Sequence, residues 1–182
     1  MFVVVDEAVV PRGCDGCGAS FKPWGYARER AVRDRGGRRR LVRPRRVRCR
    51  GCRVTHVLLP AHVAPRRADS AQVILGALLA KAGGRGHRSI AAELSLPAGT
   101  VRGWLRRATA NAERTRAEAM RLSVELDPLL GQVSPTGSPL ADALEALGTA
   151  VAAARLRLGP RVGSPTAVAM VIGKSLLHPL RT

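Results

Sequence analysis

The sequence predicts a mainly α protein with a small β module at its N-terminus, followed by a three-helix unit and then by amphipathic helices. Two observations lead to this prediction. β-rich stretches and turn residues are confined to the first third of the 182 residues, and helical periodicity fills the rest. The chain has only five aromatic residues, and its apolar content is mostly Ala, Val and Leu, which suits thin helical modules better than one thick core. We therefore expect modules over residues 1–67, 68–110 and 111–182.

Positive charge is concentrated in the first of these modules. The whole chain has a formal net charge of +18, and residues 1–67 hold 17 basic and 5 acidic residues, against 8 and 6 in residues 111–182. Such a field attracts a polyanion, and neutralising phosphates releases counterions, so nucleic acid is the natural partner. A genomic codon bias toward Arg is the alternative, but it would spread the excess evenly along the chain.

Four cysteines form two Cys-x-x-Cys pairs within residues 1–67: Cys14, Cys17, Cys49 and Cys52. Two residues between thiolates allow a tight turn to aim both sulfurs at one tetrahedral metal, and two such turns complete a closed structural site. The sequence therefore predicts one structural Zn²⁺ per chain in a small β zinc ribbon. The 31 residues between the pairs exceed the usual spacing of about 15 to 20. We expect this Arg-rich segment to form a hairpin that projects beyond the core.

Other interpretations of the cysteines are weaker. Free buried thiols and a redox pair are the alternatives, and no thioredoxin-like strand-helix context supports a redox role. His56 and His62 are possible substitute ligands, although each fits an ordinary strand or loop position. Four cysteines leave no open coordination position, so the sequence does not predict a catalytic metal.

Capping and stop signals predict three helices in the second module. The first begins at Asp69 or Ser70 and stops at Gly83–Gly84. Ser89 is expected to cap a second, short helix. The third runs from about Pro97 and ends at or beyond the arginines near residue 107.

The last two of these helices have the spacing of a helix-turn-helix. The segment HRSIAAELSLPAGTVRGWLR (His87–Arg106) places apolar residues on the inner side of each helix: Ile90, Leu94 and Leu96, then Val101, Trp104 and Leu105. In this bihelical arrangement the second helix enters the major groove of DNA.

These residues resemble the homeodomain-like helix-turn-helix of bacterial transposases. The run RVRCRGCRVTHVLLP, which ends at Pro60, resembles the zinc-ribbon end that precedes that motif in insertion-element transposases and in short actinobacterial proteins that keep only these two modules. The resemblance covers about residues 10–110 and implies DNA binding. Ser95 stands at the turn position where such motifs usually carry Gly, so a strained positive φ is expected there.

Exposed positions of the third helix are the candidate DNA contacts. Arg102 is expected to read guanine, Thr100 to bond a phosphate or a base, and Arg106 and Arg107 to hold phosphates. Gly99 and Gly103 would permit close approach of the backbone. Six further arginines between the cysteine pairs are expected to contact phosphates: Arg38, Arg39, Arg40, Arg43, Arg45 and Arg46.

Residues 111–182 are almost neutral and are predicted to be helical. Two stretches repeat apolar residues at alternating steps of three and four: Ala112, Thr115, Ala119, Leu122 and Leu126, then Leu140, Leu144, Leu147, Val151, Ala154 and Leu158. Ser138 and Pro139 mark the start of the second helix, and Ser164–Pro165 that of a last short one. The two long helices are expected to form either an intramolecular hairpin or the seam of a homodimer.

Together these observations predict a cytoplasmic, nucleoid-associated protein that binds double-stranded DNA and is not an enzyme. Its acidic residues have the spacing of solvated helix faces rather than of a catalytic cluster, and no segment has the roughly 18 to 20 apolar residues that span a membrane. A transcriptional regulator and the DNA-recognition remnant of a mobile element both fit. An RNA-binding zinc ribbon and a protein-interaction adaptor are the alternatives.

Overall fold

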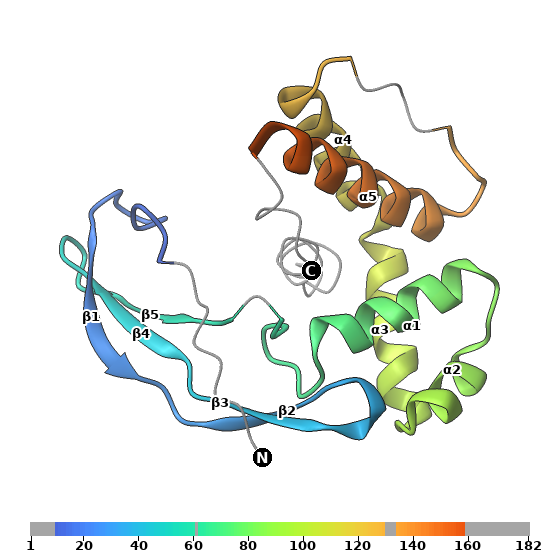
Figure 1. Ribbon diagram of the computed structural model, residues 1–182, viewed down its shortest axis with the longest axis horizontal. Coiled ribbons are helices and arrows are strands. Elements are labelled where there is room, and N and C mark those ends of the chain that lie inside the picture. The colour runs from blue at the N-terminus through green and yellow to red at the C-terminus, as the bar shows by residue number, and fades with distance from the viewer. Residues whose placement is uncertain (1–9, 61, 130–133, 159–182) are drawn as a thin grey trace.

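The computed structural model describes residues 10–60, 62–129 and 134–158, and its β strands precede its helices along the chain (Figure 1). The β region comprises β1 (Phe21–Tyr26), β2 (Arg30–Arg33), the 3₁₀ turn η1 (Arg35–Gly37), β3 (Arg39–Val42), β4 (Arg45–Cys49) and β5 (Thr55–Leu58). The helices are α1 (Ala71–Ala82), α2 (His87–Leu94), α3 (Ala98–Ala110), α4 (Ala112–Leu126) and α5 (Pro139–Leu158).

The predicted fold class, mainly α with a small β ribbon and a three-helix unit, was wrong. Five strands in two sheets precede five helices within the described residues. The error arose between the cysteine pairs, where the many arginines suggested a basic projection rather than a sheet with a core of its own. The apolar residues Val32 and Val42 alternate with these arginines, and both are buried.

The larger sheet has three antiparallel strands in the order β1-β4-β5. Its register pairs Phe21 with Cys49 and Val47 with His56, which brings the second cysteine pair next to the start of β1. The pairing of β1 with β4 shifts between Pro23 and Tyr26, and Gly25 has a φ of +72° at this bulge. A bulge inserts an extra residue into one strand and so changes which side chains share a face.

The second sheet is the hairpin β2-β3, which packs on its own small core of Val32, Val42 and Val63. Its far end lies against the helices, because η1 contacts α2. The hairpin therefore does leave the cysteine region, as predicted, but it bridges to the helical region instead of projecting into solvent (Figure 1).

Helices α1, α2 and α3 share one apolar core, to which α5 also contributes. The predicted cap of α1 is confirmed, since Ser70 Oγ accepts a hydrogen bond from the amide of Val73 at 3.3 Å. The predicted cap of α2 was wrong. This helix begins at His87 with Gly86 at the N-cap position, and Ser89 instead accepts a hydrogen bond from Arg85.

Helices α4 and α5 pack against each other within one chain, the intramolecular alternative of the two that the periodicity allowed (Figure 1). Small residues fill much of the seam. Leu122 was predicted to lie in it but is exposed, and Ser123 is buried in its place. The Ser123 hydroxyl donates a hydrogen bond to the carbonyl of Ala119 at 2.9 Å, which removes the cost of burying it.

No helix in the described part of the chain has the length and apolar content that crossing a membrane would require. The short helix predicted to start at Ser164–Pro165 lies outside the described residues.

Candidate metal centre and nucleic-acid interface

The four cysteines meet in one cluster, as their spacing predicted. Their sulfur atoms all lie within 4.8 Å of one another, and this group can hold a metal ion. Cys14 Sγ is 3.7 Å from Cys52 Sγ, and Cys17 Sγ is 3.4 Å from Cys49 Sγ. Four sulfurs at 2.3 Å from a tetrahedral ion would lie about 3.8 Å apart, close to these separations.

The two Cys-x-x-Cys turns are built in the same way. The amide of Cys14 donates to the carbonyl of Ala19 at 3.0 Å, and the amide of Cys49 donates to the carbonyl of Val54 at 2.9 Å. The residue after the second cysteine of each pair is left-handed, with φ +72° at Gly18 and +64° at Arg53. Each turn therefore aims two sulfurs inward through the same backbone geometry.

Close packing between the two turns requires a glycine at position 51. A Cβ atom there would lie 2.9 Å from the Cβ of Ala19 and 3.2 Å from the Sγ of Cys17. Gly16 has the corresponding place in the first turn, and a Cβ built on it meets nothing within 4 Å. Only the second of these two glycines is therefore needed for the turns to approach.

The surroundings of the cluster make its thiols unequal. The backbone at Ala19 and the side chain of Cys49 lower the pKa of Cys17 to about 6. The backbone at Val54 favours the thiolate of Cys52, but the other cysteines and burial outweigh it and raise the pKa of Cys52 to about 11. A bound cation would favour the thiolate form of every ligand.

Of the two histidines considered as substitute ligands, only His56 lies beside the cysteine cluster. His56 Nε2 lies 3.7 Å from Cys14 Sγ, and its ring packs edge-on against Phe21 with centroids 5.1 Å apart. His56 therefore lies at the rim of the cluster, where a ring N–H can donate to the sulfur. His62 lies near Asp34 of the hairpin, away from the sulfurs.

Helix α3 has a buried and an exposed side. Val101, Trp104 and Leu105 are buried, as predicted from their spacing. On the other side Gly99, Arg102 and Arg106 are exposed, whereas Thr100, Gly103 and Arg107 are half-buried.

The arginines of α3 differ in what they contact. Arg107 turns back along its helix, and its Nη1 donates to the carbonyl of Gly103 at 3.4 Å. No acidic residue in the described ranges forms an ion pair with Arg102 or Arg106. These two side chains are therefore the α3 cations that remain available to an anion.

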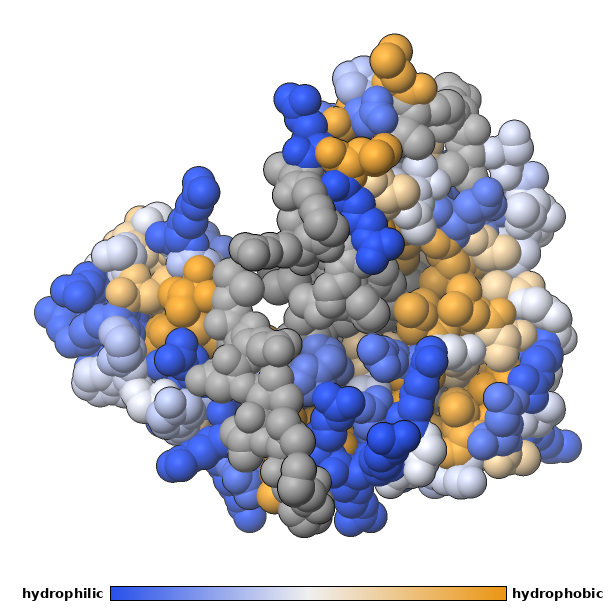
Figure 2. Space-filling model, in the orientation of Figure 1, coloured by the Kyte–Doolittle hydropathy of each residue, from blue (hydrophilic) through white to orange (hydrophobic). Residues whose placement is uncertain are grey.

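The tip of the β2-β3 hairpin contacts α2, the helix before α3. Arg38 and Arg39 are exposed, whereas Arg40 Nε pairs with Asp34 Oδ2 at 2.7 Å. A groove beside the tip is lined by hairpin residues, by Asp69, Val73 and Glu93, and by Leu94, Ser95 and Leu96, which end α2 and begin the turn to α3. Figure 2 shows hydrophilic side chains along the lower edge of this face, where Figure 1 places the hairpin.

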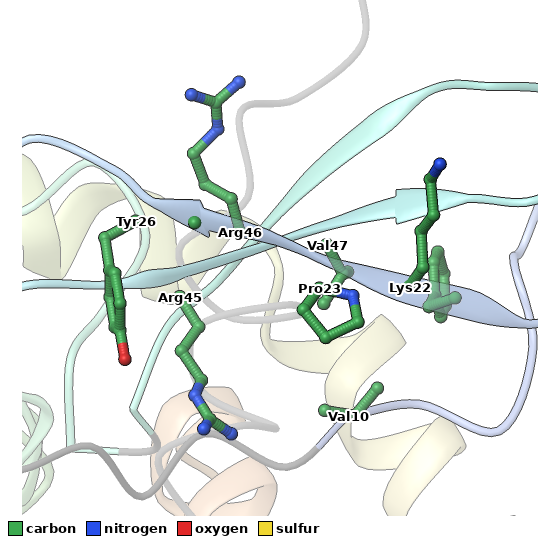
Figure 3. Close-up of a pocket in the computed structure, with 9 residues that line it drawn as sticks. Val10, Lys22, Pro23, Tyr26, Arg45, Arg46 and Val47 are labelled. Carbon is green, nitrogen blue, oxygen red and sulfur yellow. The ribbon is translucent and has the colours of Figure 1, made fainter.

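The other predicted phosphate contacts, Arg43, Arg45 and Arg46, lie elsewhere. The guanidinium carbon of Arg43 is 5.1 Å from the ring centroid of Tyr26. Arg45 and Arg46 are neighbours on β4, and their side chains point to opposite sides of the sheet (Figure 3). The candidate residues thus fall into two groups, one around α3 and the hairpin tip, and one on the three-stranded sheet.

Trp24 was missed as a candidate. It is exposed on the three-stranded sheet with Lys22 and Arg48 beside its ring. An aromatic residue within a strongly basic segment is a sequence signal for nucleic-acid contact. Trp24 gives this signal, because it lies two residues after Lys22 in the basic first module.

Comparison with known protein families gives a match that starts at the first cysteine. A family described as a domain of unknown function, DUF6431, matches residues 14–116. The chain belongs to the DUF6431 family. The matched part of this DUF6431 protein starts at the first cysteine and ends within α4, so it contains the cysteine cluster, both sheets and helices α1 to α3. No curated protein and no solved structure matches the chain.

Proposed function

We propose that this DUF6431 protein binds double-stranded DNA, with α3 as the reading helix. The observation that supports this proposal most is the exposed side of α3. It carries Arg102 and Arg106 one helical turn apart, and within the described residues no acidic side chain pairs with either of them. The turn that leads into α3 lines the same groove as the basic hairpin tip. Such a surface suits a groove flanked by phosphates.

The proposed contacts follow from the chemistry of each side chain. Arg102 lies in the first half of α3 and gives a bidentate hydrogen bond to guanine O6 and N7. Thr100 bonds a neighbouring base or phosphate, and Arg106 and Arg107 bond phosphates. Gly99 has open space where a Cβ would stand, so the DNA backbone can approach the helix there.

The hairpin is proposed to hold phosphates without reading sequence. Arg38 and Arg39 have no helix to place them in a groove, and their exposed side chains flank the tip. Arg40 contributes less, because Asp34 already pairs with it. Arg43, Arg45 and Arg46 extend the basic surface onto the three-stranded sheet.

We propose Zn²⁺ as the metal of the cysteine cluster. Four cysteine ligands and a tetrahedral arrangement are typical of structural zinc, and the sulfur separations suit its bond length. The ion would fix the two turns relative to each other, and with them the Cys49 end of β4, the strand that follows the hairpin in the chain. The complete protein would act as a transcriptional regulator or as a DNA-recognition remnant of a mobile element.

A binding titration tests the DNA proposal. A preferred duplex is first selected from a random pool, and the full-length protein is titrated with it and with a scrambled duplex at two salt concentrations. Arg102→Ala should weaken binding to the selected duplex by about 5- to 150-fold and affect the scrambled one little. Arg38→Ala and Arg39→Ala should weaken both duplexes alike and lower the salt slope by about one unit or less each.

Arg121→Ala is the matched control, because it removes the same charge from an exposed position on α4. It should leave both affinities nearly unchanged. Failure of the wild-type protein to bind any duplex at low salt would refute the proposal. Equal losses on both duplexes for Arg102→Ala would instead reassign sequence reading to another element.

A further inference from the structure

The outer face of the three-stranded sheet carries an exposed tryptophan among cations. Trp24 is 41% exposed. Lys22 pairs with Arg48 across β1 and β4, and Arg46 pairs with Val57 across β4 and β5, so these side chains share one face. Figure 3 shows Lys22 and Arg46 extending to the same side of the sheet.

The bulge at Gly25 separates this tryptophan from the other exposed aromatic residue of β1. In a regular strand Trp24 and Tyr26 would point to the same face, because side chains alternate with a period of two. The shifted register instead pairs Tyr26 with Arg45, and both lie on the side opposite Arg46 (Figure 3). Trp24 and Tyr26, which is 48% exposed, therefore stand on opposite faces.

Two cations lie against the Trp24 ring. The guanidinium carbon of Arg48 is 4.7 Å from the ring centroid, and Lys22 Nζ is 5.3 Å from it. Arg48 is held in place, since its Nε donates to the carbonyl of Arg53 at 3.0 Å. Across the described residues no carboxylate pairs with Lys22, Arg46 or Arg48. The face thus combines a partly exposed aromatic ring with uncompensated positive charge.

We propose that this face binds single-stranded DNA. An unpaired base would stack on Trp24 next to the Arg48 guanidinium, and the adjoining phosphates would contact Lys22 and Arg46. Along a duplex every base is already stacked and paired, so an exposed indole on the face of a sheet has no base face to meet there. The positive charge of the face selects a polyanion, and the choice of DNA over RNA rests on the proposed function.

The test uses the zinc-loaded full-length protein and a fluorescein-labelled oligo(dT) of about fifteen nucleotides. Trp24→Ala should weaken its binding by about 5- to 150-fold, the range for loss of one base-aromatic stack. Tyr26→Ala is the matched control, because it removes an equally exposed aromatic residue with a cation over its ring from the opposite face of the same strand. It should change the affinity less than about twofold.

Tryptophan fluorescence gives a second readout. Trp104 is only 2% exposed, so oligo(dT) should quench Trp24 alone. Trp24→Phe should keep most of the affinity, because a phenyl ring still stacks, and it should abolish the quenching. Retained zinc content and far-UV circular dichroism would show that each variant is folded.

Equal losses for Trp24→Ala and Tyr26→Ala, or no loss for either, would overturn the proposal. Tighter binding of oligo(U) than of oligo(dT) would overturn the assignment to DNA. Trp24→Ala should not change the affinity for the selected duplex. A wild-type protein that binds oligo(dT) but no duplex would contradict the proposed function and leave this inference intact.

Discussion

Arg33 on the β2-β3 hairpin forms an ion pair with Asp69, the residue before the N-cap of α1. Arg33 Nε lies 2.9 Å from Asp69 Oδ1, and Arg33 Nη2 donates to Asp69 Oδ2 at 3.4 Å. The Asp69 side chain is only 4% exposed. Two backbone hydrogen bonds of 2.7 Å accompany the pair, from Arg33 to Ala68 and from Ser70 to Arg33. The hairpin is thereby fixed to the start of the helical region, across the boundary expected between residues 67 and 68.

Asp69→Asn should destabilise the protein by about 1–3 kcal/mol, because Arg33 would keep a half-buried charge without its partner. Urea unfolding followed by circular dichroism measures the change. Glu125→Gln breaks the exposed pair with Arg121 and should cost less than about 0.5 kcal/mol. If the two substitutions had the same effect, the Arg33–Asp69 pair would not hold the hairpin in place.

The protein purified without added metal should contain one zinc ion per chain, measured by elemental analysis. Cys49→Ser should lose the ion and unfold most of the first 65 residues, since metal binding supplies much of the folding free energy of a small module. The helices α1 to α3 share an apolar core with α5 and should remain folded. A metal-free protein that keeps its β structure would disprove the zinc site.

Gly51→Ala should weaken zinc binding by about tenfold or more, because the new methyl group would push Ala19 and Cys17 away from the second turn. Competition with a chromophoric chelator measures the affinity. Gly16→Ala places the same methyl group in open space and should bind zinc like the wild type. Equal weakening by both variants would mean that close contact between the turns is not the reason why position 51 requires glycine.

Ser95→Gly should stabilise the protein by about 0.5–1 kcal/mol. The expectation of a positive φ at this turn is confirmed, since Ser95 has φ 52° and ψ 46° at the C-cap of α2. A residue with a Cβ is strained there and glycine is not. Thermal unfolding measures the gain, and Ser89→Gly inside α2 is the control that should destabilise instead. A lower melting temperature for Ser95→Gly would show that the Ser95 side chain makes a stabilising contact.

Much of the cysteine cluster and of the helix arrangement could be predicted from the sequence. The Cys14 and Cys49 pairs are local motifs, and a two-residue spacer limits where their sulfurs can point. The buried side of α3 followed from the spacing of Val101, Trp104 and Leu105. The α4–α5 seam was predicted less well, because apolar periodicity favoured Leu122 whereas close helix packing favours the smaller Ser123.

The sequence by itself determined the two cysteine turns, the helix starting after Ser70 and the exposed arginines of α3, because turns, caps and helix faces depend on residues within a few positions of one another. Tertiary structure decided which arginines lie together. The bulge at Gly25 places Trp24 and Tyr26 on opposite faces, and the Arg33–Asp69 pair brings the hairpin tip to the helices. Both depend on strand register and on contacts between residues far apart in the sequence, which no local pattern specifies.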